Sequence, residues 1–189
     1  TIDIAVAMRD LSCYKGEIEK AGKLYNPMVV PVSTDKNDFI NTLGEALYFG
    51  MLMSYAQGLS MLREASLKLK MDIPLHDVVK IWRGGCIIRS ASLEDFYKAY
   101  QQNAELENIL LDENIAAIVK TKETSIRSIT AQASQSKIAA GGLMSTLAYF
   151  DAYTTANMPV NLIQAQRDYF GAHTYERIDK PGIFHTQWD

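Results

Sequence analysis

The sequence predicts an all-α fold that ends in a long polar and aromatic tail. Apolar residues recur at helical spacing along most of the 189 residues, and no run of alternating β-branched residues bounded by tight turns interrupts them. With 48% hydrophobic and 22% charged residues, the chain has the composition of a globular protein with a sizeable core. These observations favour packed helices over a sheet.

The first expected helix covers residues 3–25, where apolar side chains lie at loosely helical spacing and Gly16 and Gly22 interrupt the pattern. Residues 26–32 contain two prolines, Pro27 and Pro31, and are expected to form a linker. The sequence therefore predicts that the first helix is separated from the remaining helices by an irregular segment.

A long central helix is expected to follow this linker. Ser33, Thr34 and Asp35 supply N-cap chemistry, and Asp38 lies in the first turn, where the helix dipole favours a negative charge. One face carries large apolar residues, namely Leu43, Leu47, Met51, Tyr55, Leu59 and Leu62. Other directions are also apolar, so we expect this helix to be enclosed by further helices or by a second subunit.

Shorter helices are expected along the rest of the chain. Pro74 suits the first turn of a helix that runs to Trp82, before the Gly84–Gly85 pair. Ser92 with Asp95 resembles a capping arrangement for a helix over residues 93–101. Further helical patterns cover residues 104–111, 115–134 and 143–156.

The C-terminal segment, residues 161–189, begins as an amphipathic helix that ends at Phe170-Gly171-Ala172. The tail that follows holds two histidines, a tryptophan, a tyrosine, a phenylalanine and a Pro-Gly turn, with no apolar periodicity. Because so many aromatic side chains are unfavourable in water, we expect the tail either to pack on this chain's own surface or to reach into another subunit.

Composition excludes several classes of protein. The formal net charge of −3 and a pI near 5.6 disfavour sequence-independent binding to nucleic acid. The longest uncharged run, residues 46–62, is shorter than the roughly 20 apolar residues that a membrane span needs. Cys13 and Cys86 lack CxxC spacing, so we expect buried thiols in a reducing compartment, the cytoplasm. The chain opens on Thr1 without a signal peptide, as a fragment of a longer protein would.

Common catalytic and metal motifs are absent from the sequence. It contains no HExxH, GxxxxGK[ST] or GxGxxG, and the three histidines have no metal-ligand spacing, so no metal site is expected. Arg9, Arg83, Arg89 and Arg167 remain as candidates for binding a phosphate or carboxylate, although an exposed ion pair is the commoner role. For His173, which follows Arg167, a hydrogen bond to a backbone carbonyl is the alternative to ligand binding.

Three stretches carry a resemblance to a known family. They are residues 54–66 (SYAQGLSMLREAS), 81–90 (IWRGGCIIRS) and 161–188 (NLIQAQRDYFGAHTYERIDKPGIFHTQW). The chain closely resembles the C-terminal half of decarboxylating 6-phosphogluconate dehydrogenases over nearly its whole length. That resemblance implies an oxidoreductase of the pentose phosphate pathway, which converts 6-phosphogluconate with NADP to ribulose 5-phosphate, carbon dioxide and NADPH.

The resemblance also implies which part of the enzyme binds the cofactor, which part carries the catalytic residues and which part forms the dimer. The Rossmann domain that binds most of the NADP lies N-terminal to this region, and the family's catalytic Lys and Glu lie before Thr1. The chain alone is therefore expected to be inactive. Residues 1–172 would form the helical domain that makes most of a homodimer interface, and the tail, residues 173–189, would reach the partner subunit's substrate site.

Carried over residue by residue, Arg167 is expected to hold the substrate phosphate and His173 to hydrogen-bond the sugar acid. Both lie in the motif QAQRDYFGAHTYE, which is intact. The resemblance gives Arg83 and Arg89 no catalytic role, so we interpret them as supports of the bend at Gly84–Gly85.

Arg9 resembles the family's second phosphate-binding arginine, in a pattern of Arg9, Ser12 and Lys15 at three-residue steps. The pattern departs from the family at Ala7, where an aromatic residue is usual, and at Ile4, where an acidic residue is usual. Two other functions remain open. One is a free-standing helical dimerisation module without activity, and the other is a relative that acts on a different phosphorylated sugar acid.

Overall fold

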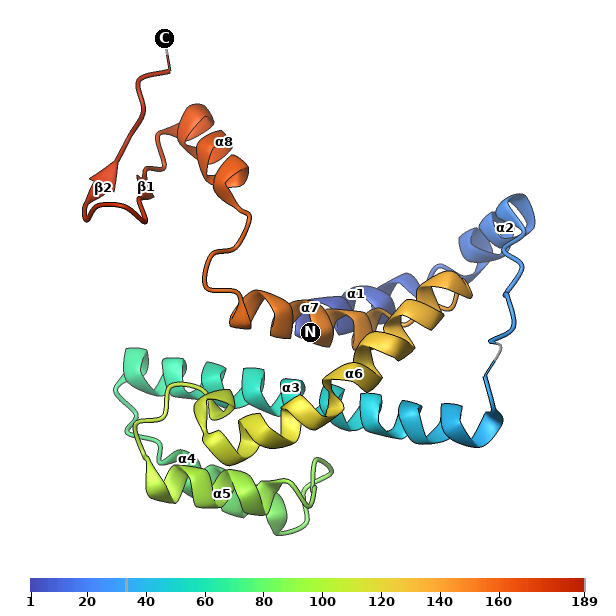
Figure 1. Ribbon diagram of the computed structural model, residues 1–189, viewed down its shortest axis with the longest axis horizontal. Helices are drawn as coiled ribbons and strands as arrows, with labels where there is room; N and C mark the ends of the chain where they lie inside the picture. Colours follow the sequence, from blue (N-terminus) through green and yellow to red (C-terminus); the bar gives the residue numbers. More distant parts are fainter. Residues whose placement is uncertain (33, 189) are drawn as a thin grey trace. The chain divides into compact units, whose positions relative to one another are not determined.

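The computed structural model describes residues 1–32 and 34–188, which form two compact units, Thr1–Phe150 and Asp151–Asp189. Helices make up nearly all of the regular secondary structure, so the predicted all-α class is confirmed (Figure 1). Two two-residue strands, Tyr175–Glu176 and Ile183–Phe184, add a small hairpin in the tail. No helix of the described residues is long and apolar enough to cross a membrane.

The N-terminal segment forms two helices, α1 (Ile2–Leu11) and α2 (Lys15–Tyr25), so the prediction of one helix was wrong. The break does not fall at a glycine. Instead, the Ser12 hydroxyl donates to the carbonyl of Arg9 at 2.5 Å, and the Cys13 amide bonds the carbonyl three residues earlier at 3.1 Å. Such local bonds compete with the regular helical ladder and end α1.

The central helix α3 (Lys36–Leu69) begins as predicted. The Asp35 carboxylate accepts from the amides of Asn37 and Asp38 at 2.9 and 3.2 Å, which confirms Asp35 as the N-cap. Of the other two residues expected to supply N-cap chemistry, Thr34 lies just before the N-cap, and Ser33 lies outside the described residues, as does Asp189 at the end of the tail.

Four further helices complete this part of the chain: α4 (Leu75–Arg83), α5 (Leu93–Gln102), α6 (Glu113–Gln135) and α7 (Gly141–Thr154). The helix expected over residues 104–111 was wrong, because only the 3-10 turn Ile109–Leu111 is helical. Side-chain oxygens of Asn103 and Asn108 accept backbone amides two residues later, at 3.1 and 3.0 Å. These Asx-type turns replace helical hydrogen bonds.

The predicted capping role of Ser92 was also wrong. Helix α5 does begin after Ser92, but its side chain makes no cap hydrogen bond. The hydroxyl instead donates to the Tyr48 hydroxyl on α3 at 3.0 Å. Because Ser92 is buried against α3, its hydroxyl serves the contact between two helices and not the start of its own helix.

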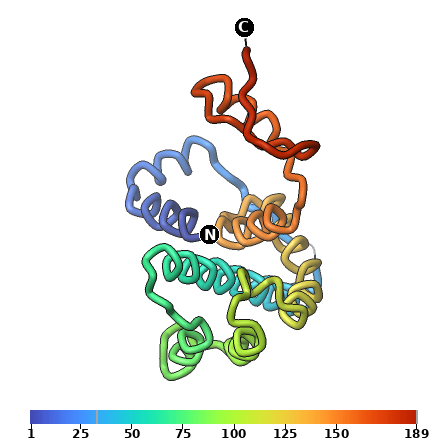
Figure 2. The backbone as a smooth tube through the Cα atoms, turned by 90° about the vertical axis from the view of Figure 1, so that its left-hand side faces the viewer, coloured from blue at the N-terminus to red at the C-terminus, as the bar shows by residue number. Residues whose placement is uncertain are grey.

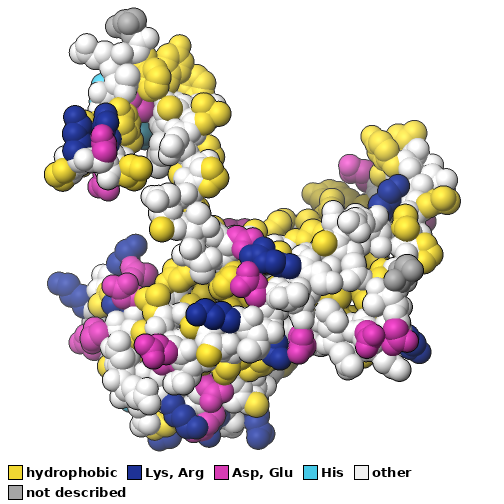
Figure 3. Space-filling model, viewed as in Figure 1, with side chains coloured by type: hydrophobic (Ala, Val, Ile, Leu, Met, Phe, Trp, Pro, Cys, Tyr) yellow, Lys and Arg dark blue, Asp and Glu magenta, His cyan; other side chains and the backbone are white. Residues whose placement is uncertain are grey.

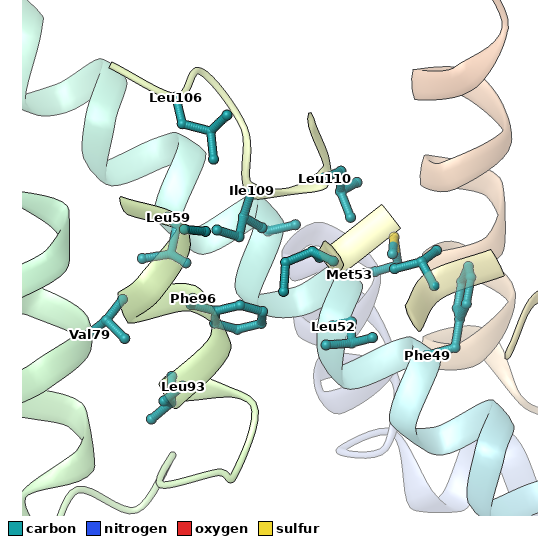
Figure 4. Packing of buried hydrophobic residues seen from close by; sticks show 14 of the residues in the cluster. Phe49, Leu52, Met53, Leu59, Val79, Leu93, Phe96, Leu106, Ile109 and Leu110 are labelled. Atoms are coloured by element: carbon teal, nitrogen blue, oxygen red, sulfur yellow. The ribbon is translucent and has the colours of Figure 1, made fainter. Parts of the chain in front are cut away.

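The core of the first unit surrounds α3. Helices α1 and α7 lie along one side of it and α4 and α5 along the other, and α6 crosses it obliquely and packs against it (Figures 1 and 2). Buried side chains from α3, α4, α5 and the 3-10 turn meet in one cluster (Figure 4), including Phe49, Leu52, Met53, Leu59, Val79, Leu93, Phe96 and Ile109. At Gly50 the backbone of α3 comes close to α7, since an added Cβ would lie 3.2 Å from Leu143.

Helix α3 is not enclosed on every side within the chain. One face stays exposed, and it includes Leu47, whose exposed fraction is 57%. Large apolar neighbours on that face are also exposed, namely Ile40, Leu43 and Met51. A helix with core on one side and uncovered apolar residues on another has a second packing surface.

Both cysteines are exposed and unpaired, so the prediction that they are buried was wrong. Cys13 lies in the turn between α1 and α2, and Cys86 lies in the irregular bend after Gly85, whose φ is +118°. Neither position belongs to the buried face of a helix, which explains the exposure.

The second unit contains α8 (Asn161–Gly171) and the tail. The predicted end of α8 is confirmed, because Ala172 adopts a left-handed conformation and its amide bonds the Asp168 carbonyl at 2.8 Å. The tail then turns back as an antiparallel hairpin that pairs Tyr175 with Phe184.

Candidate functional site

A buried carboxylate organises the second unit. Asp168, in the last turn of α8, has no exposed surface. Its Oδ1 accepts from the Thr174 amide at 3.1 Å and lies 2.9 Å from Nδ1 of His185. Its Oδ2 accepts from the Thr186 amide at 2.9 Å and from the Trp188 indole at 3.0 Å. One side chain therefore ties both ends of the tail to α8.

The hydrogen bonds decide the ionisation of this carboxylate. Burial by itself would raise the pKa of Asp168, but the hydrogen bonds from His185, Thr186 and Trp188 outweigh it and lower the pKa to about 2. Asp168 is therefore ionised at neutral pH, and its contacts with the tail are charge-assisted. Since a carboxylate accepts only, Nδ1 of His185 carries the hydrogen in this pair.

Aromatic contacts extend the packing around the carboxylate. The Trp188 ring meets Tyr169 of α8 edge to face, with centroids 5.6 Å apart. Across the hairpin, Tyr175 and Phe184 lie 6.3 Å apart, and the Tyr175 hydroxyl bonds the Thr186 hydroxyl at 2.7 Å. These aromatic residues of the tail thus pack within their own unit.

The structure brings Arg167 and His173 to one face of α8. Within residues 1–32 and 34–188, the exposed side chain of Arg167 makes no hydrogen bond or ion pair. The His173 ring lies over Gly171, where an added Cβ would be 3.0 Å from the ring. Because Arg167 and Gly171 are four residues apart on a helix, they share a face. The exposed guanidinium of Arg167 and the exposed imidazole of His173 therefore lie on the same side of α8, near its C-terminal end.

Arg9 lies in the other unit, near the end of α1. Its guanidinium pairs with Asp10 at 3.1 Å, and both side chains are largely exposed. Such surface pairs contribute little free energy, so the guanidinium remains available to an anion. Ser12 and Lys15 of the same sequence pattern lie in and just after the turn between α1 and α2.

The two arginines of the glycine bend differ in their contacts. Arg83 pairs with Glu94 at 2.5 Å and lies over the Tyr97 ring at 5.9 Å, so it joins α4 to α5. This agrees with the structural role expected for it. Arg89 makes no ion pair within the described part of the chain, and a support role for it stays a prediction.

Asp168 is the site residue that sequence reasoning missed. One signal was present: a carboxylate in the last turn of a helix is disfavoured by the helix dipole, so an aspartate there calls for specific donors. The identity of those donors was not readable, since they lie between 6 and 20 residues further along the chain.

Among the described residues no group of three or more His, Cys, Asp or Glu side chains is placed to hold a metal ion.

Residues 1–188 match the model of the family described as 6-phosphogluconate dehydrogenase, C-terminal domain. The chain belongs to this family. The resemblance of the three sequence stretches is thereby confirmed.

Individual relatives agree with the family model. The decarboxylating 6-phosphogluconate dehydrogenase of Lactococcus lactis subsp. lactis is 45% identical over 184 residues, which are 97% of this chain and 39% of that protein. The NADP(+)-dependent, decarboxylating enzyme of Bacillus subtilis is 44% identical over 185 residues, with the same coverage. The chain thus spans well under half the length of these relatives.

A solved structure shares the fold. The 6-phosphogluconate dehydrogenase of Plasmodium falciparum, described in its apo form, with its cofactor NADP+ and with its substrate 6-phosphogluconate, has a TM-score of 0.89 and 40% identity. The match covers 97% of this chain and 40% of that chain. The expected helical domain of this family is confirmed.

Proposed function

We propose that this chain is the C-terminal part of an NADP-dependent decarboxylase that converts 6-phosphogluconate to ribulose 5-phosphate, carbon dioxide and NADPH. The match of residues 1–188 to the C-terminal domain of this enzyme family carries the proposal. Relatives that are 44–45% identical over 97% of the chain bear the name of that enzyme.

NADP is held mainly outside this chain in this proposal. Within the described residues there is no unit of strand, glycine-rich turn and helix of the kind that cradles a dinucleotide, so these residues do not fit the cofactor. The catalytic Lys and Glu of the family are likewise assigned to sequence before Thr1. The chain alone should therefore have no activity.

The contribution of this chain to the reaction is binding of the substrate. Arg167 offers an exposed guanidinium whose planar fork matches a phosphate dianion, and His173 beside it can hydrogen-bond the sugar acid. Arg9 is proposed as a second ligand of the phosphate. Binding energy at a phosphate remote from the reacting carbon can position that carbon and so contribute to the rate.

We propose a homodimer in which the tail of each subunit completes the partner's substrate site. Two uncovered apolar surfaces support it. The exposed face of α3 borders a groove of about 740 Å³ lined by residues that include Leu47, Met51, Trp82, Ile87 and Leu143. On α8, hydrophobic side chains are exposed (Figure 3); the exposed fraction of Phe170 is 74%. Substrate affinity and dimerisation would then be linked.

We also propose that the protein is cytoplasmic. Cys13 and Cys86 are free thiols, which persist most readily in a reducing compartment. Neither is part of the binding scheme above.

The test replaces Arg167→Ala in the full-length enzyme and measures steady-state kinetics. The KM for 6-phosphogluconate should rise roughly tenfold to a hundredfold, since a hydrogen bond to a charged group contributes about 1.5–3 kcal/mol. The KM for NADP should stay unchanged. Arg177→Ala is the matched control, because Arg177 lies in the same unit but is engaged with Asp179 at 2.6–2.7 Å.

Equal changes in both KM values, or the same effect from the control variant, would count against the proposal. The chain on its own, assayed with 6-phosphogluconate and NADP, should show no turnover. Turnover by the isolated chain would contradict the proposal that the NADP site and the catalytic residues lie outside this chain.

A further inference from the structure

We propose that Asp168 is a positioning residue for the anion site: its buried carboxylate fixes where His173 stands relative to Arg167 and thereby sets the affinity for the phosphorylated substrate. This inference rests on the proposed role of Arg167 and His173 as substrate ligands. Asp168 itself does not touch the substrate in this scheme.

The backbone around His173 is held in an unfavourable conformation. Ala172 and Thr174, the residues on either side, both have left-handed φ angles, +50° and +61°. For a β-branched residue such as Thr174 this conformation is a marked outlier, and it persists only where the surroundings hold it. Strain of this kind concentrates at functional sites.

Asp168 is the residue that holds this turn from both sides. Its main-chain carbonyl accepts the Ala172 amide at 2.8 Å, and its carboxylate Oδ1 accepts the Thr174 amide at 3.1 Å. His173 lies between these two anchored amides. The direction in which its ring leaves the backbone, over Gly171, therefore depends on Asp168.

The returning strand is fastened to the same carboxylate. Oδ1 also contacts the His185 ring at 2.9 Å, and Oδ2 accepts from the Thr186 amide and the Trp188 indole. The turn at His173 and the end of the tail thus meet at one charged group. With Asp168 removed, four donors would lose their acceptor and both segments could move.

The carboxylate leaves Arg167 free although the two residues are adjacent in sequence. Its hydrogen bonds are made with the tail, and no ion pair joins it to Arg167 among the described residues. A helix places neighbouring residues about 100° apart, so Asp168 faces the tail while Arg167 faces solvent. The positive charge available to a phosphate is therefore not neutralised locally.

The experiment uses the full-length dimeric enzyme and the variant Asp168→Asn, which keeps the side-chain size and one acceptor oxygen. The KM for 6-phosphogluconate should rise about tenfold, as expected from losing a charge-assisted hydrogen bond, while the KM for NADP stays constant. Asp179→Asn is the matched control: it removes the same charge from the same unit, at a tail carboxylate bonded to Arg177, and should leave both KM values unchanged.

A double-mutant cycle separates positioning from stability. If Asp168 acts through His173, Asp168→Asn should raise the substrate KM far less in a His173→Ala background than in the wild type. An undiminished effect in that background overturns the inference, and so does an equal rise in the KM for NADP. Failure of Arg167→Ala to change the substrate KM would instead refute the proposed ligand role.

Trp188→Phe provides a second test if Asp168→Asn does not fold. It removes one donor to Oδ2 and keeps an aromatic ring beside Tyr169. A smaller rise in the substrate KM, with an intact dimer by light scattering, supports positioning. An unchanged KM in a folded Trp188→Phe dimer overturns it.

Discussion

In the unit Thr1–Phe150, most buried side chains are apolar and come from several helices. In the described part of the unit Asp151–Asp189, by contrast, Asp168 is the only buried residue. The first unit is stabilised by apolar area spread over many residues. The second depends on hydrogen bonds that converge on one carboxylate, with aromatic edges around it. The stability of the first unit is therefore spread over many side chains, whereas that of the second depends mainly on one.

This difference has consequences for function. A broad apolar core tolerates change at its surface and provides a stiff support, as α3 does for the helices around it. A small unit held by one charged residue can be ordered or released by few interactions. The proposed substrate ligands Arg167 and His173 belong to the second kind of unit.

The largest effect is expected from Phe49→Ala. Phe49 is fully buried on α3 and meets Phe150 edge to face at 5.3 Å, so the substitution should lower the free energy of unfolding of the first unit by about 3–5 kcal/mol. Denaturant unfolding followed by circular dichroism measures it. Phe170→Ala, at an exposed phenylalanine of α8, should lower the free energy of unfolding of its own unit far less in the isolated chain. If the two substitutions lowered the free energy of unfolding by similar amounts, the contrast between the units would be contradicted.

A smaller effect, confined to the second unit, is expected from acid. The pKa of Asp168 is lowered from 3.8 to about 2, so its ionised form stabilises the folded unit above pH 3.8. That contribution should disappear as the pH falls through the folded-state pKa of about 2. Fluorescence of Trp188 in a Trp82→Phe chain should report the transition before helical signal from the first unit is lost.

The control for the acid experiment is Asp168→Asn, which should lack this transition because no carboxylate remains to titrate at that position. A transition of the same size in Asp168→Asn would show that other groups cause it. Loss of helical signal together with the Trp188 change would show that the two units do not respond separately.

Local signals explain which features of the fold could be predicted. The start of α3 at Asp35 and the end of α8 at Gly171 follow from capping and left-handed residues within a few positions of each boundary. Ser92 misled the prediction because its partner, Tyr48, lies 44 residues away on α3. The prediction for the cysteines was wrong because the turn between α1 and α2 exposes Cys13 and the bend after α4 exposes Cys86.

The candidate site was predictable in part. Arg167 and His173 stand in a motif that resembles the family, whereas their placement on one face follows from the position of the His173 ring over Gly171. Asp168 could not be assigned from the sequence, since its partners at separations of 6 to 20 residues are brought together only by the tail's return. Arg9 remains a prediction.

The structure of the full-length dimer with bound 6-phosphogluconate tests the proposed role of the tail most directly. We expect the guanidinium of Arg167 from one subunit to lie at hydrogen-bond distance, about 3 Å, from the phosphate in the other subunit's site, with His173 contacting the sugar acid. A substrate phosphate bound without Arg167, or by the Arg167 of the same subunit, would contradict that role.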